Sequence, residues 1–319
     1  MSKSVLSFNT PTGLMFHHFH GGDHPVVQGS IDQSEFEQIL QAVDAKHLLS
    51  AQEWLERHAS KSLCSGDSCI TFDDALLCQI EIAKPILDKY NLKAFWFIYT
   101  SIFFGGVDRL ELYRYYRTTC FVSIDQFYLK FFEKCTELHG KKFKDAMSKF
   151  RPNEYLTNSP FYTDEDKIFR FTRDHFLSVE KYDAIMLGMM QDSNFEREAI
   201  ADRLWLKKKH LVQLHNEGHI IGCHSDNHPT VMAKLSYAEQ VKEYSQNAKR
   251  IKSLIGFYPT TASHPCNSYN DVTLGILSQL GIKLGFRADT ASLEVRTSLE
   301  YPREDHANIL EMLRGKNAN

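Results

Sequence analysis

The chain alternates between short apolar runs and longer segments in which apolar residues recur every three or four positions. The short runs have the length of buried strands, whereas the longer segments have the periodicity of amphipathic helices. The predicted strands lie at residues 13–19, 68–72, 92–99, 219–223, 260–263 and 282–287. The predicted helices lie at residues 34–49, 75–90, 204–217, 236–254 and 272–281. Strands that alternate with helices in this way predict an α/β protein.

Residues 105 to about 200 interrupt this alternation. The segment is rich in Phe, Tyr, Lys and Glu, and it has helical spacing at residues 127–138 and 168–190. We therefore predict a largely helical insertion, for which a lid or a subunit interface, and so a homo-oligomer, is the expected use. We expect its aromatic residues to fill a helical core or that interface; they include Tyr113, Tyr115, Tyr116, Phe121, Phe127, Tyr128, Phe131 and Phe132.

Charge and composition narrow the classes of function. The 37 basic and 40 acidic residues give a net charge of −3, which argues against a nucleic-acid-binding protein. The sequence shows neither a signal peptide nor an apolar run long enough to span a membrane, so we expect a cytoplasmic protein. Its seven scattered cysteines then fit reduced thiols rather than disulfides.

Two adjacent carboxylates, Asp73 and Asp74, directly follow the predicted strand at residues 68–72. Side chains alternate across a strand, but both carboxylates reach one pocket if the chain turns where the strand ends. One carboxylate could then bind a metal ion while the other accepts a proton. The alternative is that Asp74 caps the next helix and interacts with its dipole.

His224 and His228 follow the predicted strand at residues 219–223 in the same way. A spacing of four residues places both imidazoles on one side of a helical turn, and neutral imidazole is a good ligand for Zn²⁺ and similar ions. Two solvated loop histidines are the alternative. The histidine pair and the aspartate pair both follow strands, as catalytic residues do in βα-barrels, and this favours the metal-ligand interpretation of the histidine pair.

Together these segments resemble the polysaccharide deacetylase superfamily, also called the NodB-homology or carbohydrate esterase 4 group. Residues 71–74 read TFDD, which is similar to the first motif of that family. Residues 224–229 read HSDNHP, which is similar to the second motif. The resemblance covers roughly residues 64–101 and 204–289.

This resemblance implies a distorted (β/α) barrel of about seven strands that forms a single domain over residues 1–319, with the helical insertion at about 105–200. It implies that Asp74, His224 and His228 hold one divalent metal ion. Zn²⁺ is expected, and Fe²⁺, Co²⁺, Ni²⁺ and Mn²⁺ are alternatives. Three protein ligands leave positions for water and substrate, as in catalytic sites. Asp73 is implied as the general base that takes a proton from water.

The chain departs from the family pattern at the third motif, which usually reads Arg-x-Pro-Tyr. The aligned residues 263–266 are Ser, His, Pro and Cys, so the arginine that steadies the base is missing. Arg303 is the candidate to orient Asp73 instead. The backbone N–H of Cys266, beside Pro265, is the candidate to bind the oxyanion.

Histidines are expected to supply the remaining roles. The family uses a late histidine to protonate the leaving amine, for which His306 is favoured here and His264 is the alternative. A solvated position is the competing interpretation for His306, and a structural hydrogen bond for His264. His18, after the first predicted strand, is expected to line the substrate pocket. It belongs to a cluster, alternatively a separate zinc site, with His17, His20 and His24.

The resemblance predicts a hydrolase that removes an N-acyl group, acetyl or formyl, from an amino sugar. For a cytoplasmic enzyme, a nucleotide-linked or lipid-linked precursor of surface polysaccharide is the expected partner rather than the finished polymer. One alternative is hydrolysis of a non-sugar amide, such as a cyclic ureide, on the same barrel. Another is a decayed member that binds carbohydrate, with exposed aromatic residues stacking on sugar rings, but does not turn it over. A third uses Cys266 or Cys223 as a thiol nucleophile without a metal ion.

Overall fold

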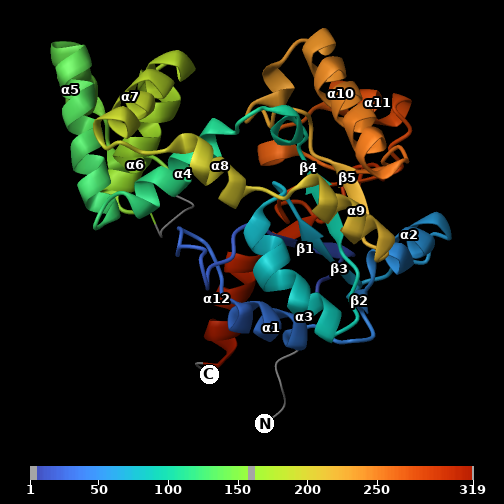
Figure 1. Cartoon of the computed structure of the whole chain (residues 1–319). Coiled ribbons are helices and arrows are strands. Elements are labelled where there is room, and N and C mark those ends of the chain that lie inside the picture. Colours follow the sequence, from blue (N-terminus) through green and yellow to red (C-terminus); the bar gives the residue numbers. More distant parts are fainter. Residues whose placement is uncertain (1–5, 157–161, 318–319) are drawn as a thin grey trace. The chain divides into compact units, whose positions relative to one another are not determined.

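The computed structural model describes residues 6–156 and 162–317 and divides the chain into two compact units. The first unit combines residues 1–108 with 203–319 and contains all the strands; the second comprises residues 109–202. Each unit is described in turn (Figure 1).

The first unit is built on a sheet of parallel strands in the order β7-β6-β5-β4-β3-β1-β8, with the short β2 pairing beside β3. The two ends of this path approach each other, because Phe286 of β7 forms a bridge with Tyr301, just before β8. The result is a nearly closed barrel of seven strands, which confirms the predicted distorted (β/α) barrel. The strands are β1 Thr12–Phe16, β2 Leu48–Leu49, β3 Ser68–Phe72, β4 Phe95–Ile98, β5 Ile220–Cys223, β6 Thr261–Ser263, β7 Leu284–Phe286 and β8 Arg303–Asp305.

Helices and short helical turns follow the strands and cover the outside of the barrel (Figure 1). Several begin at a capping box, including α1 at Asp32, α2 at Ser50 and α10 at Ser236, in which the side chains of the first cap residue and of a glutamate three residues later each accept the other residue's backbone N–H. The α-helices are α1 Gln33–Ala42, α2 Ala51–Ala59, α3 Lys84–Lys89, α9 Lys208–Asn216, α10 Tyr237–Ile255, α11 Asp271–Gln279 and α12 His306–Asn317. The π-helix η1 is Gln79–Ala83, and the 3-10 turns are η2 Ser101–Phe104, η5 Met232–Lys234 and η6 Pro265–Asn267.

Element bounds differ from the predicted ones where polar chemistry overrides apolar periodicity. The first helix ends at Ala42 rather than at residue 49, and the apolar pair after it forms β2 instead. The helix predicted at 75–90 begins only at Gln79. The last strand, β8, was not predicted, because it is short and its Arg303 and Glu304 are charged yet buried.

The second unit is helical over its described residues. A cluster of aromatic rings forms its core, with Phe131 5.1 Å from Phe169 and Tyr182 6.1 Å from Phe131 between ring centroids. This packing matches the expected helical core, and residues 157–161 of the predicted insertion lie outside the described residues. The helices are α4 Arg109–Thr119, α5 Ile124–Lys149, α6 Asp164–Phe171, α7 Val179–Asp192 and α8 Arg197–Leu204, with the turns η3 Pro152–Glu154 and η4 Thr172–Phe176.

Within the described ranges, no helix has the length and apolar character needed to cross a membrane.

Candidate active site

The aspartate pair lies in a tight turn at the carboxyl end of β3. Asp74 and Ala75 both have left-handed backbone conformations, with φ of 73° and 53°. This reversal at the strand end lets neighbouring side chains turn into the same site. Asp74 is not a helix cap, because the helix that follows begins five residues later at Gln79. The buried Gln79 amide instead donates to the carbonyls of Asp73 and His17 and ties the ends of β3 and β1 together.

The histidine pair lies in an irregular loop after β5, not on the helical turn that the spacing suggested. Ser225 and His228 have positive φ values of 65° and 54°, and the His228 N–H donates to Ser225 Oγ at 3.1 Å. The two imidazole centroids are 5.0 Å apart. The loop therefore brings the two rings together by backbone reversal rather than by helical periodicity.

Asp74, His224 and His228 converge on one point. Asp74 Oδ1 lies 3.4 Å from His224 Nε2 and 3.3 Å from His228 Nε2, and the three side chains are at most 13% exposed. Among the described residues no hydrogen-bond partner satisfies Asp74 Oδ1, although it is buried. A buried carboxylate oxygen that faces two imidazole nitrogens is an arrangement that a divalent ion completes. The residues thus fit the metal ion that the sequence implied.

Hydrogen bonds to Ser263 orient His224 with Nε2 toward Asp74, and an acidic side chain lies near the Nδ1 atom of His228. His224 Nδ1 lies 2.6 Å from Ser263 Oγ and 3.1 Å from the Ser263 carbonyl; the carbonyl can only accept a hydrogen bond, so Nδ1 is the donor to it. Ser263 Oγ in turn lies 3.2 Å from Asp73 Oδ1. His228 Nδ1 lies 3.5 Å from Asp108 Oδ2. Protons on the Nδ1 atoms leave the Nε2 lone pairs for a metal ion, as the outer partners of metal-binding histidines do.

The charges in this cluster act strongly on one another. Burial alone would raise the pKa of Asp74, but His228 and His224 outweigh burial and hold its pKa well below the usual range. Burial opposes charge on His228, yet Asp74 and Asp108 raise the pKa of His228 to about 9. The carboxylates of Asp74 and Asp108 therefore favour positive charge at the place where the three side chains meet.

Arg303 binds the Asp73 carboxylate through two hydrogen bonds. Its two terminal nitrogens donate to the two carboxylate oxygens of Asp73 at 2.7 Å each, and the Arg303 side chain is completely buried. Gly13 leaves room for this side chain, since a Cβ at residue 13 would lie 2.9 Å from Arg303 Cγ. Burial would raise the pKa of Asp73, but the guanidinium outweighs it and the pKa is lowered. Asp73 is thus an ionised and firmly oriented carboxylate.

The three histidines predicted as proton donors or pocket residues, His306, His264 and His18, are all buried. His306 is buried, with Nδ1 3.2 Å from the Met15 carbonyl and Nε2 2.6 Å from the Gly29 carbonyl, so both nitrogens face backbone. His264 is also buried; its Nε2 faces the Leu299 carbonyl, and burial lowers its pKa to about 4. His18 is buried at the end of β1.

His17 is the histidine at this strand end that reaches the aspartates, and it was not singled out from the sequence. Its Nε2 lies 3.8 Å from Asp73 Oδ2, and its side chain is 28% exposed. The register of the sheet would have indicated it: Phe16 pairs with Phe72, so the next residues, His17 and Asp73, leave the sheet side by side. Asp108, the partner of His228, was also missed, because nothing in its local sequence marks it.

The candidate oxyanion segment follows β6. Pro265 is buried and Cys266 is exposed, and Cys266 has a left-handed φ of 50° within η6. Cys223 does not suit a nucleophile, because its thiol is fully buried and burial raises its pKa well above the usual range.

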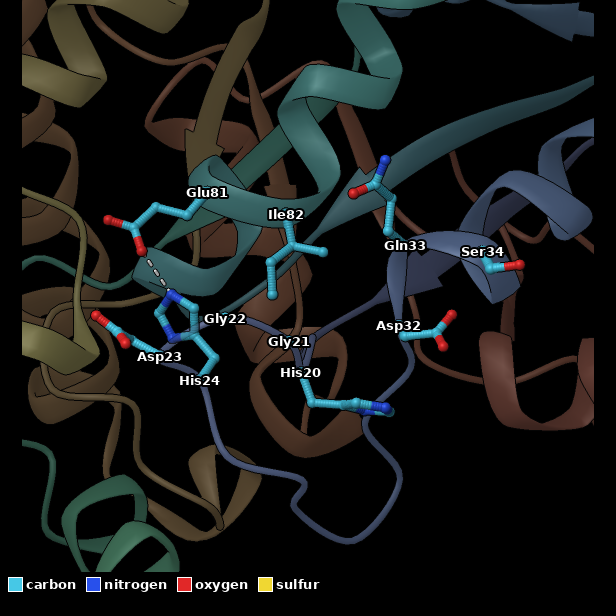
Figure 2. Close-up of a pocket in the computed structure, with 10 residues that line it drawn as sticks. All are labelled: His20, Gly21, Gly22, Asp23, His24, Asp32, Gln33, Ser34, Glu81 and Ile82. Atoms are coloured by element: carbon cyan, nitrogen blue, oxygen red, sulfur yellow. Dashed lines mark hydrogen bonds and ion pairs between the residues drawn. The ribbon is translucent and has the colours of Figure 1, made fainter.

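The remaining histidines of the first loop lie around a separate pocket of about 580 Å³ (Figure 2). His24 Nε2 pairs with Glu81 Oε2 at 2.7 Å, and His20 Nδ1 lies 2.8 Å from Ser30 Oγ. The pocket is lined by residues 20–24 and 32–34 together with Glu81 and Ile82.

His20, Asp32 and Glu35 carry potential ligand atoms within 4.8 Å of one another at this pocket. Both carboxylates already have structural partners, however. Asp32 and Glu35 form the capping box of α1, and Glu35 also pairs with Arg314 at 3.0 Å. These contacts account for the two acidic groups without an ion, so this group of residues gives no support to a second zinc site at the pocket.

Comparisons with known proteins agree with this fold. Residues 173–285 match a family model described as polysaccharide deacetylase; the match includes His224 and His228 but does not reach Asp73 and Asp74. No curated protein matches the chain.

Three solved structures have a similar fold. A Streptococcus pyogenes deacetylase, PplD, in complex with acetate is 16% identical, with a TM-score of 0.52 over 97% of this chain and 99% of that chain. IcaB from Ammonifex degensii is 13% identical, with a TM-score of 0.56 over 97% and 98%. A de-N-acetylase from Aggregatibacter actinomycetemcomitans is 13% identical, with a TM-score of 0.55 over 95% and 99%.

The chain therefore has the distorted (β/α) barrel that these solved proteins share. The resemblance to the polysaccharide deacetylase superfamily, seen first in the two sequence motifs, is confirmed by the family model and by the fold.

Proposed function

We propose that this protein is a metal-dependent hydrolase that removes an N-acyl group, acetyl or formyl, from an amino sugar. The observation that carries the proposal is the convergence of Asp74, His224 and His228 on one point beside the oriented carboxylate of Asp73. Solved proteins with this fold are named as deacetylases, which supports deacylation as the reaction class. We extend the proposal to the whole chain as one deacetylase domain with the helical unit inserted.

Asp74, His224 and His228 would hold one divalent ion, with Zn²⁺ as the first choice for two imidazoles and a carboxylate. Such an ion supplies Lewis acidity toward the acyl carbonyl and a nearby water molecule. The chain's own residues supply the proton transfers. Asp73 accepts a proton from the attacking water, and Arg303 keeps that carboxylate ionised and fixed in orientation.

Breaking the C–N bond also requires a proton on the leaving amine nitrogen. His17 is the donor that this proposal assigns, because its side chain is partly exposed and its Nε2 lies beside Asp73. The roles first expected for His306 and His264 remain predictions to be compared with it. Both of these rings are buried, and the two nitrogens of His306 face backbone carbonyls.

The substrate is proposed as an amino-sugar precursor linked to a nucleotide or lipid. This choice continues the expectation of a cytoplasmic enzyme. Assays on a nucleotide-linked N-acetylamino sugar, on an N-acetylated oligosaccharide and on a cyclic ureide separate this proposal from a polymer deacetylase and from a non-sugar amidase.

The decisive experiment measures metal content and turnover on the same samples. Elemental analysis of the wild type should show about one equivalent of a divalent ion, lost in Asp74→Ala and His228→Ala. Asp73→Asn should keep the ion and lose turnover, because it removes only the proton acceptor. His215→Ala, a histidine outside the site, is the matched control and should keep both. His17→Gln, His264→Gln and His306→Gln, assayed together, identify the proton donor.

A wild type that binds no metal after reloading with divalent ions would overturn the proposal. Metal binding without turnover of any N-acyl substrate would instead indicate a carbohydrate-binding member of the family.

A further inference from the structure

The loop that carries both metal-ligand histidines has little regular structure of its own. Residues 224–228 lie between β5 and η5, and two of them, Ser225 and His228, have left-handed backbones. Such conformations cost roughly 1 kcal/mol or more for residues with a side chain, so surrounding contacts must impose them.

One face of α10 supplies these contacts. Glu243, Asn247 and Arg250 are spaced four and three residues apart, which places them on the same side of the helix. Glu243 Oε2 accepts the backbone N–H groups of Asp226 and Asn227 at 3.0 and 2.8 Å. Its other oxygen accepts the Asn227 side-chain amide at 2.8 Å.

The second contact, Asn247, is completely buried and joins the loop to the neighbouring strand. Its Oδ1 accepts the backbone N–H of His224 at 3.2 Å, and its Nδ2 donates to the Ile98 carbonyl at 3.0 Å. The His224 N–H also donates directly to the Ile98 carbonyl at 3.1 Å, so the Asn247 side chain reinforces the attachment of the first ligand histidine to the end of β4.

The third contact, Arg250, holds the middle of the loop. It donates to Asp226 Oδ1 at 2.6 Å, and Thr100 Oγ1 donates to the same oxygen at 2.7 Å. Asp226 is buried, and its carbonyl accepts the N–H groups of Thr100 and Ser101. Asp226 stands midway between the two ligand histidines in the sequence, so fixing it limits the movement of both.

From these contacts we infer that Glu243, Asn247 and Arg250 on α10 are positioning residues that preorganise His224 and His228 for metal binding. The inference rests on the proposed function. None of the three side chains is itself a metal ligand; each acts through the backbone or through Asp226. Outer partners of this kind commonly change metal affinity by about 10- to 100-fold when they are removed.

The test is a competition titration of Zn²⁺ against a chromogenic chelator, which gives the dissociation constant without an activity assay. Glu243→Ala and Arg250→Ala should each raise the dissociation constant by about tenfold to a hundredfold. Glu243→Gln and Arg250→Lys keep part of the hydrogen bonding and should restore part of the affinity. Lys249→Ala removes an exposed charge from the adjacent position of α10 and should leave the affinity unchanged.

Circular dichroism and thermal melting of the proteins without added metal identify any variant that does not fold. If an alanine variant does not fold, the conservative variant at the same residue, Glu243→Gln or Arg250→Lys, is compared with the wild type instead. A role confined to stability would lower the melting temperature and leave the dissociation constant of the folded protein unchanged, which would overturn the inference alone. A wild type that binds no Zn²⁺ would overturn the proposed function, and this inference with it.

Discussion

At the scale of single residues, the site depends on one buried ion pair. Asp73 and Arg303 are both nearly inaccessible to water, and the pair uses two parallel hydrogen bonds. A lysine at residue 303 keeps the charge but cannot make both bonds from one planar group. Arg303 therefore fixes the orientation of the Asp73 carboxylate through both hydrogen bonds, which a lysine could not do.

Arg303→Lys should lower kcat by about tenfold to a hundredfold, because the base is no longer held in one orientation. Its metal content should equal that of the wild type, because Arg303 does not touch the ligand side chains. Steady-state kinetics and elemental analysis check the two expectations. Arg314→Lys, whose side chain is 68% exposed, is the control and should change neither. Unchanged kcat in Arg303→Lys would contradict an orienting role.

Sequence reasoning works well at this scale where the chemistry is local. The two aspartates and the two histidines could be found because each pair follows an apolar strand within a recognisable motif. Arg303 was named as a candidate because the arginine usual in the third motif was missing. His17 and Asp108 could not be found without the sheet register and the course of the loop after β4, which depend on contacts between distant segments.

At the scale of elements, the strand before the histidine loop is closely packed. A Cβ at Gly222 in β5 would lie 2.5 Å from a Phe97 ring atom and 2.6 Å from Thr261 Oγ1. Both neighbours belong to adjacent strands, so neither can move freely. Glycine is therefore required here by close approach rather than by backbone conformation.

Gly222→Ala should destabilise the protein by about 1–3 kcal/mol through overpacking. Gly275→Ala is the matched control, because residue 275 is exposed in α11 and a Cβ there meets nothing within 4 Å. That change should stabilise the protein by about 0.5–1 kcal/mol, since alanine favours the helix. Urea unfolding of the two variants measures both changes in the free energy of unfolding. Equal changes would show that the side chains around residue 222 can move to accommodate a Cβ.

The strands that sequence patterns missed share one property: neither contains an apolar run long enough to be recognised as a strand. In β8 the chain places Arg303 and Glu304 inside the protein, so no apolar run marks the strand. Similarly, β2 contains only two residues and was absorbed into a predicted helix. Long periodic elements such as α10 and clear apolar runs such as β3 and β4 were predicted to within a few residues.

At the scale of the whole molecule, the barrel buries histidines that are neutral in the folded state. His219 accepts N–H bonds from Ala94 and Trp96 on Nδ1, which leaves that nitrogen without room for a proton. Burial, with Lys93 and Lys84 nearby, lowers the pKa of His219 to about 4. An unfolded histidine titrates near pH 6.5.

Between about pH 6.5 and pH 4 the unfolded chain therefore binds a proton at His219 that the folded barrel does not. As the pH falls through this range, protonation of His219 in the unfolded chain should lower the free energy of unfolding by about 1.4 kcal/mol per pH unit. His219→Gln removes the titrating group, so its stability should depend less steeply on pH by that amount.

Urea unfolding at several pH values measures this difference. Tryptophan fluorescence isolates the barrel, because the three tryptophans, Trp54, Trp96 and Trp205, all belong to the first unit. Identical slopes for His219→Gln and the wild type would show that His219 titrates normally in the folded protein.

The architecture as a whole was the most predictable level. Alternating strands and helices were enough to predict an α/β protein, and the resemblance to the deacetylase superfamily implied the barrel. Closure of the barrel could not be predicted from local sequence patterns. It depends on the bridge between Phe286 and Tyr301 and on the strand β8, and neither feature has a local sequence signature.

The place of β8 in the chain affects how the protein is made. Asp73 leaves the ribosome 230 residues ahead of Arg303, roughly 10 to 50 s earlier at ordinary rates of translation. During that interval β1 has β3 on one side and an open edge on the other, since its second partner does not yet exist. The nascent chain thus holds the Asp73 carboxylate without its counter-ion until β8 emerges.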